Sequence, residues 1–260
     1  MDSPGSFGGA RKGLSVIDLD DSVNDARDHE LDLPGEWSVS GAASGGGGAQ
    51  NPLHIVVLDH RDSFTYNLVQ ALAATGARIS VRVAETISLE QLERLAPDRL
   101  LLSPGPGSPR QARLARQALE RYRGQIPILG VCLGHQVIAE SLGAEVVATG
   151  TPTHGKSEAV YHCGTGLFAG VPDPFMAARY HSLAVRRESL PPSLQLLAIN
   201  HNGMVMAVGV PGEPTWGLQF HPESFLTPDG DLMLSSFVSG VCCEKDDRTR
   251  NFERMDSGAF

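Results

Sequence analysis

One cysteine stands where an apolar, strand-like run gives way to a helical pattern. The sequence Ile-Pro-Ile-Leu-Gly-Val-Cys-Leu-Gly-His-Gln occupies positions 126–136, and a helical pattern continues from Gln136 to Leu142. The glycines on both sides of Cys132 permit the sharp strand-to-helix turn called a nucleophile elbow, which places the thiol beside free helical N–H groups. These groups favour a thiolate and can bind an oxyanion, so Cys132 is a candidate nucleophile. A buried cysteine without a chemical role is the alternative.

A histidine and a glutamate lie two positions apart in a segment that follows a predicted strand. The sequence Phe-His-Pro-Glu-Ser covers positions 220–224, and the spacing of His221 and Glu223 puts both side chains on one side of an extended backbone. A neutral imidazole can take a thiol proton, while a carboxylate fixes the tautomer of the ring and stabilises the imidazolium. Cys132, His221 and Glu223 therefore have the types of a nucleophile, a general base and an orienting group.

A loop rich in glycine and proline follows another predicted strand. It reads Ser-Pro-Gly-Pro-Gly-Ser-Pro at positions 103–109. Gly105 and Gly107 permit close approach of the backbone to a ligand and offer N–H groups to an oxyanion, whereas the prolines stiffen the loop. An ordinary turn is the alternative, but the position after a neighbouring strand favours a binding loop.

Alternating strand and helix patterns must bring these three segments together. Buried-strand runs lie at 54–58, 79–83, 99–102 and 126–131, and helical patterns lie at 65–75, after Ser88, at 110–122 and at 136–142. Four successive strand–helix units predict an α/β fold with a doubly wound, mostly parallel sheet and flanking helices. Such sheets bind ligands at the carboxyl ends of their strands, which is where Cys132 falls.

The pattern changes after Leu142. Short strand patterns lie near residues 146, 159 and 176 and at 194–199, 205–208 and 216–220, joined by Gly, Pro and Asn turns. We therefore expect a small antiparallel strand region in addition to the parallel sheet. One last helical segment, at about 231–241, is expected to pack back on the sheet.

Composition divides the chain into one globular domain and two tails. At 260 residues and 41% hydrophobic content, the chain can bury one full core. Residues 1–51 are acidic and close with a Gly/Ser-rich run, so we predict a disordered acidic tail and a Gly-rich linker there. We predict the folded domain at 52–241 and a frayed C-terminal tail at 242–260.

Charge and cysteine content argue against several classes of function. The formal net charge is −9, and most of it lies in the acidic tail, so nothing indicates binding to nucleic acid or to an anionic membrane. The four cysteines lack metal-type spacing, so we predict reduced thiols and no metal site. No apolar run approaches the roughly 20 residues that span a bilayer, and we expect a cytoplasmic protein.

Six stretches of the sequence, which follow one another in the order found in a known family, give the chain a family resemblance. The elbow, the Ser-Pro-Gly-Pro-Gly loop and the Gln-Phe-His-Pro-Glu-Ser stretch at 219–224 together resemble the class I (triad) glutamine amidotransferases. Three further stretches, at 62–68, 154–156 and 179–183, resemble the small subunits (component II) of anthranilate synthase and aminodeoxychorismate synthase. The resemblance implies a flavodoxin-like sheet over about residues 53–241 and leaves out both tails.

The resemblance also implies a role for each matching residue. Cys132 would attack the side-chain amide of L-glutamine, and His221 and Glu223 would complete the triad. The residues that would bind glutamine or its oxyanion are Gly105, Pro106, Gly107, Leu133, Gln136, Ser182 and Leu183. The ammonia would pass to a chorismate-binding synthase subunit (component I). The resemblance implies no cofactor in this chain, with Mg²⁺ expected only in the synthase subunit.

Two departures from the family pattern leave the identity of the partner open. His60 stands where the family usually has asparagine, and Thr153 stands where methionine is common. The motifs fit anthranilate and aminodeoxychorismate synthesis alike. One alternative is the amidotransferase of another ammonia-using synthase, such as one that makes GMP, CTP, carbamoyl phosphate or a secondary metabolite. Alternatives of other classes are a cysteine hydrolase of peptides or esters and a non-catalytic regulatory subunit.

Overall fold

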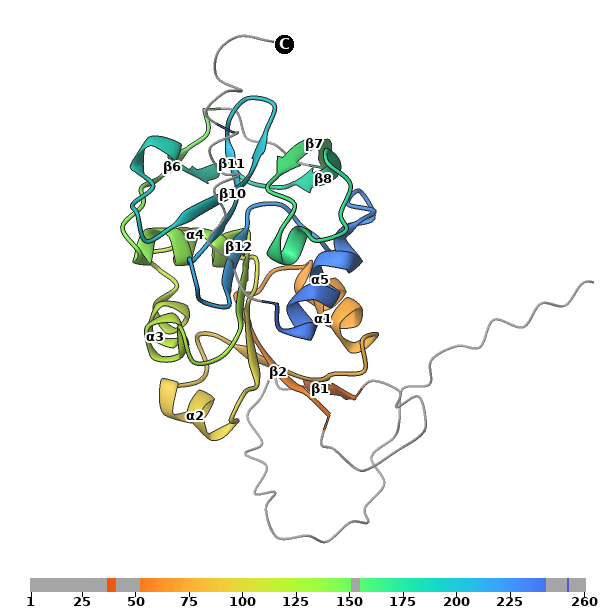
Figure 1. Cartoon of the computed structure of the whole chain (residues 1–260). Coiled ribbons are helices and arrows are strands. Elements are labelled where there is room, and N and C mark those ends of the chain that lie inside the picture. Colours follow the sequence, from red (N-terminus) through yellow and green to blue (C-terminus); the bar gives the residue numbers. More distant parts are fainter. Residues whose placement is uncertain (1–36, 41–51, 151–154, 242–251, 253–260) are drawn as a thin grey trace, which may run out of the picture. The chain divides into compact units, whose positions relative to one another are not determined.

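The computed structural model describes residues 37–40, 52–150, 155–241 and 252 of the chain. Within these ranges, ten strands form one mixed sheet in the order β1-β3-β2-β4-β5-β12-β11-β10-β7-β8 (Figure 1). The strands of this sheet are β1 (Trp37–Ser40), β2 (His54–Asp59), β3 (Arg78–Val83), β4 (Arg99–Leu102), β5 (Ile128–Val131), β7 (Lys156–His162), β8 (Phe175–Arg179), β10 (Gln195–Asn200), β11 (Val205–Gly209) and β12 (Thr215–Leu218). Pairing changes from parallel to antiparallel at β12.

One half of the sheet is parallel and carries helices on both faces. Parallel pairs join β2 to β3, β2 to β4, β4 to β5 and β5 to β12. The helices are α1 (Thr65–Ala73), α2 (Leu89–Arg94), α3 (Arg113–Tyr122), α4 (Leu133–Ser141) and α5 (Gly230–Ser239). Helices α1 and α5 lie on one face, and α2, α3 and α4 lie on the other (Figure 1). This arrangement confirms the predicted doubly wound α/β fold, and the order β3-β2-β4-β5-β12 is that of flavodoxin-like sheets.

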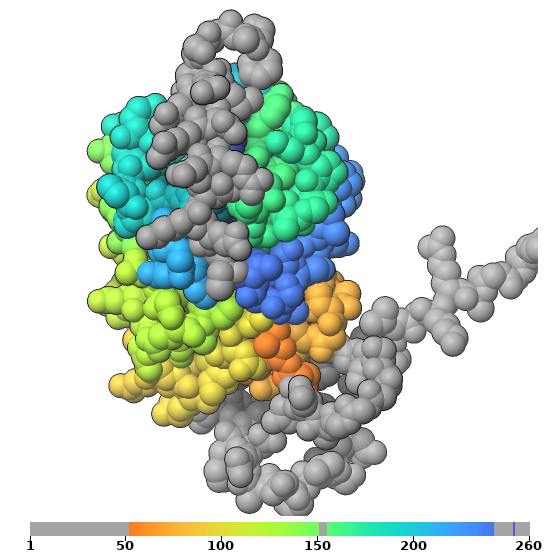
Figure 2. Space-filling view, in the orientation of Figure 1, coloured from red at the N-terminus to blue at the C-terminus, as the bar shows by residue number. Residues whose placement is uncertain are grey.

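Burial explains why these segments adopt their elements. Residues 55–58 of β2 and 100–102 of β4 have no exposed surface, because helices cover both faces of the parallel strands. On one face of the sheet, α1 (orange) and α5 (blue) lie side by side at the surface of the molecule (Figure 2). A capping box begins α2, as the spacing of Ser88 and Gln91 in the sequence predicts: Ser88 N donates to Gln91 Oε1 at 2.8 Å, and Gln91 N donates to Ser88 Oγ at 3.2 Å.

The other half of the sheet is antiparallel and continues directly from the parallel half. Antiparallel pairs join β12 to β11, β11 to β10, β10 to β7 and β7 to β8. The expected antiparallel strands are thus mostly an extension of the main sheet. Two short strands, β6 (Val146–Ala148) and β9 (Leu183–Val185), pair separately. The three-residue β9 and the 3-10 helices η1 (Gly166–Phe168) and η2 (Arg187–Ser189) were not predicted, because so few residues show no periodicity.

The predicted tails need correction at two places. Trp37–Ser40 forms β1, which pairs antiparallel with β3 at the edge of the sheet, so the prediction of a disordered segment over 1–51 is wrong for these four residues. Their alternation of apolar and polar types fits a strand, but it is too short to stand out from the polar tail. Phe252 is buried, and its carbonyl accepts a hydrogen bond from Arg187 Nη2 at 3.1 Å, so the predicted fraying is wrong for that residue. The other tail residues lie outside the described ranges.

Candidate active site

Cys132 stands between β5 and α4, at the carboxyl end of a parallel strand. Its backbone has φ 53° and ψ −101°, a left-handed conformation that is strained for a residue with a side chain. The Cys132 N–H donates to the Leu218 carbonyl of β12 at 2.8 Å, which holds this conformation in place. The thiol therefore begins the helix at a sharp turn, as the sequence predicts for a nucleophile elbow.

Gly130 and Gly134, the two glycines of the elbow, are needed for close packing and not for the backbone conformation that the sequence predicts. Neither adopts a positive φ, because the unusual backbone conformation falls on Cys132 itself. A Cβ on Gly134 would lie 2.2 Å from the Leu102 carbonyl oxygen, and a Cβ on Gly130 would lie 2.4 Å from the Gly134 backbone. The glycines thus allow α4 to pack closely against β4 and β5, and this packing fixes where the thiol stands.

His221 and Glu223 form a buried pair just beyond the end of β12. His221 Nδ1 lies 2.6 Å from Glu223 Oε1, and both side chains are almost completely buried. Burial alone lowers the pKa of His221, but interactions with the Cys132 thiol and the Glu223 carboxylate raise it to about 10. His221 Nε2 has no partner in hydrogen-bonding geometry among the described residues. With Nδ1 committed to the carboxylate, Nε2 is the atom available to exchange a proton with the thiol.

Two aromatic rings hold the imidazole from the side. The ring centroids of Phe64 and Tyr180 lie 5.1 Å and 5.2 Å from that of His221, and both pairs are edge-on. Phe64 precedes α1, whereas Tyr180 follows β8, so the two rings that contact His221 come from the parallel and the antiparallel half of the sheet. Sequence reasoning did not assign these two residues to the site, although both belong to stretches that carry the family resemblance.

The glycine-proline loop lies against the elbow. A Cβ on Gly105 would come within 2.9 Å of Leu133 Cδ2 and 2.4 Å of His60 Cβ, so only glycine fits between them. Pro106 and Gly107 are exposed beyond it, and Gly107 has φ 86°. Burial lowers the pKa of His60, and its N–H donates to Ser103 Oγ at 2.9 Å. His60 is thus a neutral side chain that supports the loop.

Two of the predicted glutamine-binding residues, Gln136 and Leu183, are hydrogen-bonded to each other. Gln136 is buried, and its Nε2 donates to the Leu183 carbonyl at 3.1 Å and to Gln219 Oε1 at 3.2 Å. The Ser182 carbonyl accepts from Thr149 N at 2.9 Å. Both amide hydrogens of Gln136 are therefore used within the protein, and its Oε1 is the atom left for a ligand.

The structure brings most of the predicted site residues together at one edge of the sheet. Cys132 and Leu133 lie at the elbow, His221 and Glu223 lie beside it, Gly105 touches it, and Gln136 and Leu183 are linked by a hydrogen bond. Gln219 also belongs to this group, because its Nε2 donates to Cys132 Sγ at 3.8 Å. Its place at the start of the Gln-Phe-His-Pro-Glu-Ser stretch was the available signal.

Other candidate features have simpler accounts. His135 is completely buried, which lowers its pKa to about 3 and leaves it neutral. His154 lies outside the described residues. In the described ranges, no group of three or more His, Cys, Asp or Glu side chains is placed to hold a metal ion. None of the helices in the described part of the chain is both long enough and apolar enough to cross a membrane.

The chain is similar over most of its length to proteins of a known family. The family model for glutamine amidotransferase class-I matches residues 56–241. Aminodeoxychorismate/anthranilate synthase component 2 of Bacillus subtilis (strain 168) is 43% identical over 184 residues, which cover 71% of this chain and 95% of that protein. Anthranilate synthase component 2 of Thermus thermophilus is 44% identical over 199 residues, which cover 75% of this chain and 97% of that protein.

A solved structure supports the fold independently. A protein of Thermoplasma acidophilum that carries the name of a GMP synthase subunit superposes with a TM-score of 0.66 and 22% identity, covering 81% of this chain and all of that one. At this identity the likeness concerns the fold alone. The family model covers more than half of the chain, and the relatives match nearly their whole length. This chain therefore belongs to the class I glutamine amidotransferase family of enzymes.

Proposed function

We propose that this chain is the glutamine-hydrolysing subunit of a chorismate-aminating synthase, and that Cys132, His221 and Glu223 form its catalytic triad. The observation that carries the proposal is the buried His221–Glu223 pair, 2.6 Å apart, beside a cysteine at the start of a helix. The names of the relatives, which are component 2 of anthranilate or aminodeoxychorismate synthase, support the assignment to chorismate amination.

In the first half of the reaction, the sulfur attacks the side-chain amide carbon of glutamine. With the thiol proton held on His221 Nε2, the attacking group is a thiolate, and Glu223 stabilises the imidazolium through Nδ1–H, which fits the raised pKa of His221. The tetrahedral intermediate carries an oxyanion, which the Leu133 N–H and the backbone of Gly105 and Gly107 would bind. When the C–N bond breaks, His221 gives its proton to the departing nitrogen, so ammonia leaves and a thioester remains.

In the second half, water hydrolyses the thioester. His221 takes a proton from the attacking water, the C–S bond breaks, and the proton returns to sulfur as glutamate leaves. The Ser182-Leu183 backbone and the Oε1 of Gln136 would hold the amino acid end of the substrate. The proposed reaction needs no cofactor in this subunit, because every proton passes through one imidazole.

The product explains why a partner is required. Ammonia is protonated in neutral water and is then no longer a nucleophile, so it is useful only beside an acceptor site. We therefore propose that the partner is a chorismate-binding synthase subunit, with anthranilate or 4-amino-4-deoxychorismate as the product.

One experiment tests both parts of the proposal. The chain is mixed with chorismate and a candidate synthase subunit, with either glutamine or ammonium chloride as the nitrogen source, and the aminated product is identified by mass spectrometry. Cys132→Ala should abolish the glutamine-dependent reaction and leave the ammonia-dependent one intact. Cys163→Ala, which changes the other buried cysteine in the described part of the chain, is the matched control and should retain both. Glutamine-dependent product with Cys132→Ala would contradict the assigned nucleophile.

A further inference from the structure

The sulfur of Cys132 has a second polar neighbour besides the imidazole. Gln219, which follows β12, has no exposed surface, and its Nε2 donates to Cys132 Sγ at 3.8 Å. Its Oε1 accepts from Gln136 Nε2 at 3.2 Å. The amide of Gln219 thus bridges the nucleophile and the side chain that would face the substrate. We propose that Gln219 is a positioning residue for the nucleophile, held by a hydrogen-bond chain that ends in a buried ion pair.

The orientation of the Gln219 amide is determined by its two neighbours. Gln136 presents its N–H₂ group, so Gln219 must turn its oxygen toward it and its own N–H₂ group toward the sulfur. A flipped amide would set two donors against each other and leave the sulfur without one. Gln136 is in turn fixed, because its other hydrogen is bonded to the Leu183 carbonyl.

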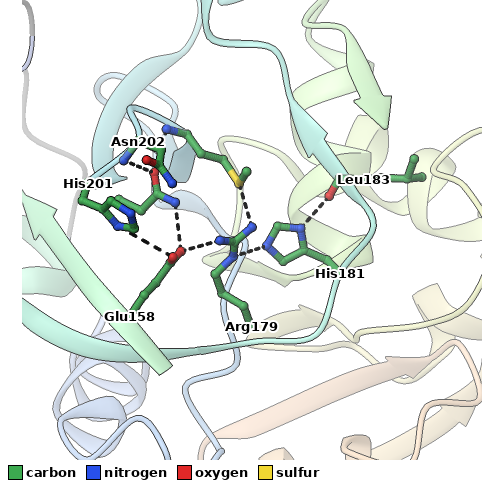
Figure 3. A network of polar contacts seen from close by, with 8 residues as sticks. Glu158, Arg179, His181, Leu183, His201 and Asn202 are labelled. Carbon is green, nitrogen blue, oxygen red and sulfur yellow. Dashed lines mark hydrogen bonds and ion pairs between the residues drawn. The ribbon is translucent and has the colours of Figure 1, made fainter. Parts of the chain in front are cut away.

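The chain continues from Leu183 into the antiparallel half of the sheet (Figure 3). The Leu183 carbonyl also faces His181 Nδ1 at 2.9 Å, while Arg179 Nε donates to His181 Nε2 at 3.0 Å. Because Nε2 accepts, Nδ1 carries the hydrogen and donates to the carbonyl. Burial, followed by the charge of Arg179, lowers the pKa of His181 to about 4, so the ring stays neutral and keeps this tautomer.

The far end of the chain is anchored by three strands. Arg179 of β8 lies 2.7 Å from Glu158 of β7, and Asn200 of β10 donates to the same carboxylate at 2.9 Å. Both members of the ion pair are largely buried, and Figure 3 shows the side chains converging from the neighbouring strands. An ion pair fixed in this way sets the His181 ring, and the ring sets the Leu183 carbonyl that orients Gln136.

The inference rests on the proposed function, since it treats Cys132 as the nucleophile. An amide N–H aimed at sulfur favours the negative charge that develops when the thiol proton moves to His221. It also restricts the rotation of the Cys132 side chain, so the sulfur stays on the line of attack. Loss of this donor should lower the turnover number and leave the binding of glutamine nearly unchanged.

The test measures the reactivity of Cys132 directly. Gln219→Met keeps the volume of the side chain but removes both the donor to sulfur and the acceptor for Gln136. Gln219→Glu keeps the shape and the acceptor for Gln136, and replaces the donor by a carboxylate oxygen beside the sulfur. Thr215→Val on β12 is the control, because Thr215 is fully buried and its hydroxyl has no partner among the described residues. The measurements are the alkylation rate of Cys132 by iodoacetamide at pH 7, followed by peptide mapping, and kcat and KM for glutamine in the holoenzyme.

We expect Gln219→Met to slow alkylation and kcat about tenfold, and Gln219→Glu to slow both more. KM should stay little changed in Gln219→Glu, which keeps the contact with Gln136. Thr215→Val should match the wild type. Alkylation of Gln219→Met at the wild-type rate would overturn the inference, and so would an equal loss in Thr215→Val, which would point to general damage to the strand. If the wild type hydrolyses no glutamine, the proposed function fails, but the alkylation rates still decide the role of Gln219.

Discussion

The two halves of the sheet place their polar groups in different ways. In the parallel half, Cys132 and the glycine-proline loop follow the ends of strands, and backbone geometry positions them. In the antiparallel half, Glu158 and Arg179 lie within strands, and side-chain bonds between neighbouring strands position them. The proposed nucleophile thus lies where the backbone turns, whereas the groups that we propose orient it lie where strands pair. β12 belongs to both halves and leads into Gln219 and His221.

The two halves of the sheet also differ in what stabilises them. The buried residues of the parallel strands are mostly apolar, and these strands are stabilised by burial between two helical layers. The antiparallel half carries a buried charge pair, which stabilises the fold only while both partners are present. A substitution near β5 or β12 should therefore mainly lower the rate of catalysis, whereas a substitution in β7 or β8 should mainly lower the stability of the fold.

Glu223→Gln should have the largest effect, on catalysis alone. Without the carboxylate, no negative charge stabilises the imidazolium that forms when His221 takes the thiol proton, so kcat should fall about 10,000-fold. Glutamate release by the holoenzyme is the measurement. Glu213→Gln just before β12, which removes a partly exposed carboxylate paired with Arg123, is the matched control and should stay near wild type. A Glu223→Gln enzyme with wild-type kcat would exclude Glu223 from the triad.

Arg179→Met should destabilise the fold by about 3–5 kcal/mol, because it leaves Glu158 buried and uncompensated. Urea unfolding gives the free energy of unfolding. Arg186→Met breaks the exposed pair with Glu145 and should cost no more than about 1 kcal/mol. Similar losses in the two variants would mean that the buried pair is not what stabilises the antiparallel half.

Acid should destabilise the parallel half through His135. Burial lowers its pKa to about 3, so only the unfolded chain takes up a proton between pH 6.5 and that value. Its contribution to stability is complete above pH 6.5 and should fall by about 2–3 kcal/mol by pH 4.5. Urea unfolding at both pH values, for wild type and His135→Gln, measures the difference. Equal pH dependence in the two proteins would exclude His135 as the cause.

Phe64→Leu should have the smallest effect. It removes one of the two rings that contact the His221 imidazole, while keeping an apolar side chain at the start of α1. Since such ring contacts contribute about 0.5–1.5 kcal/mol, kcat should fall about threefold to tenfold with KM unchanged. Tyr66→Leu, on an exposed position of the same helix, should leave the turnover of the isolated subunit unchanged. A rise in KM for Phe64→Leu would instead indicate a contact with the substrate.

The parallel half could be predicted from the sequence because its signals are local. The run before Cys132, the capping residue Ser88 and the glycines of the loop each specify their own segment, and right-handed strand–helix units leave few arrangements. The His221–Glu223 pair was also accessible, because two positions in an extended segment share one side. These features are confirmed as structural elements, and the catalytic roles stay predictions.

The antiparallel half could not be predicted in the same way. Nothing in the local pattern of β7 or β8 says that Glu158 will meet Arg179, because a strand period fixes the side of a residue and not its partner on another strand. The amide of Gln219 went unassigned for the same reason, since its neighbours Gln136 and Cys132 lie far away in the chain. The sequence predicts that the glycines beside Cys132 adopt the unusual backbone conformation of the turn, whereas Cys132 itself adopts it. The packing of α4 against β4, which no local pattern reveals, is what requires a glycine at position 134.

The position of β12 between β5 and β11 has a consequence for the nascent protein. The cysteine leaves the ribosome long before residues 215–223, so a growing chain carries the sulfur of the site without its proton acceptor. Only when the late strand enters between its two neighbours do imidazole and thiol meet, and contacts so distant along the chain form slowly. By the proposed mechanism, incomplete copies consume no glutamine, and the capacity to release ammonia arises together with the finished sheet.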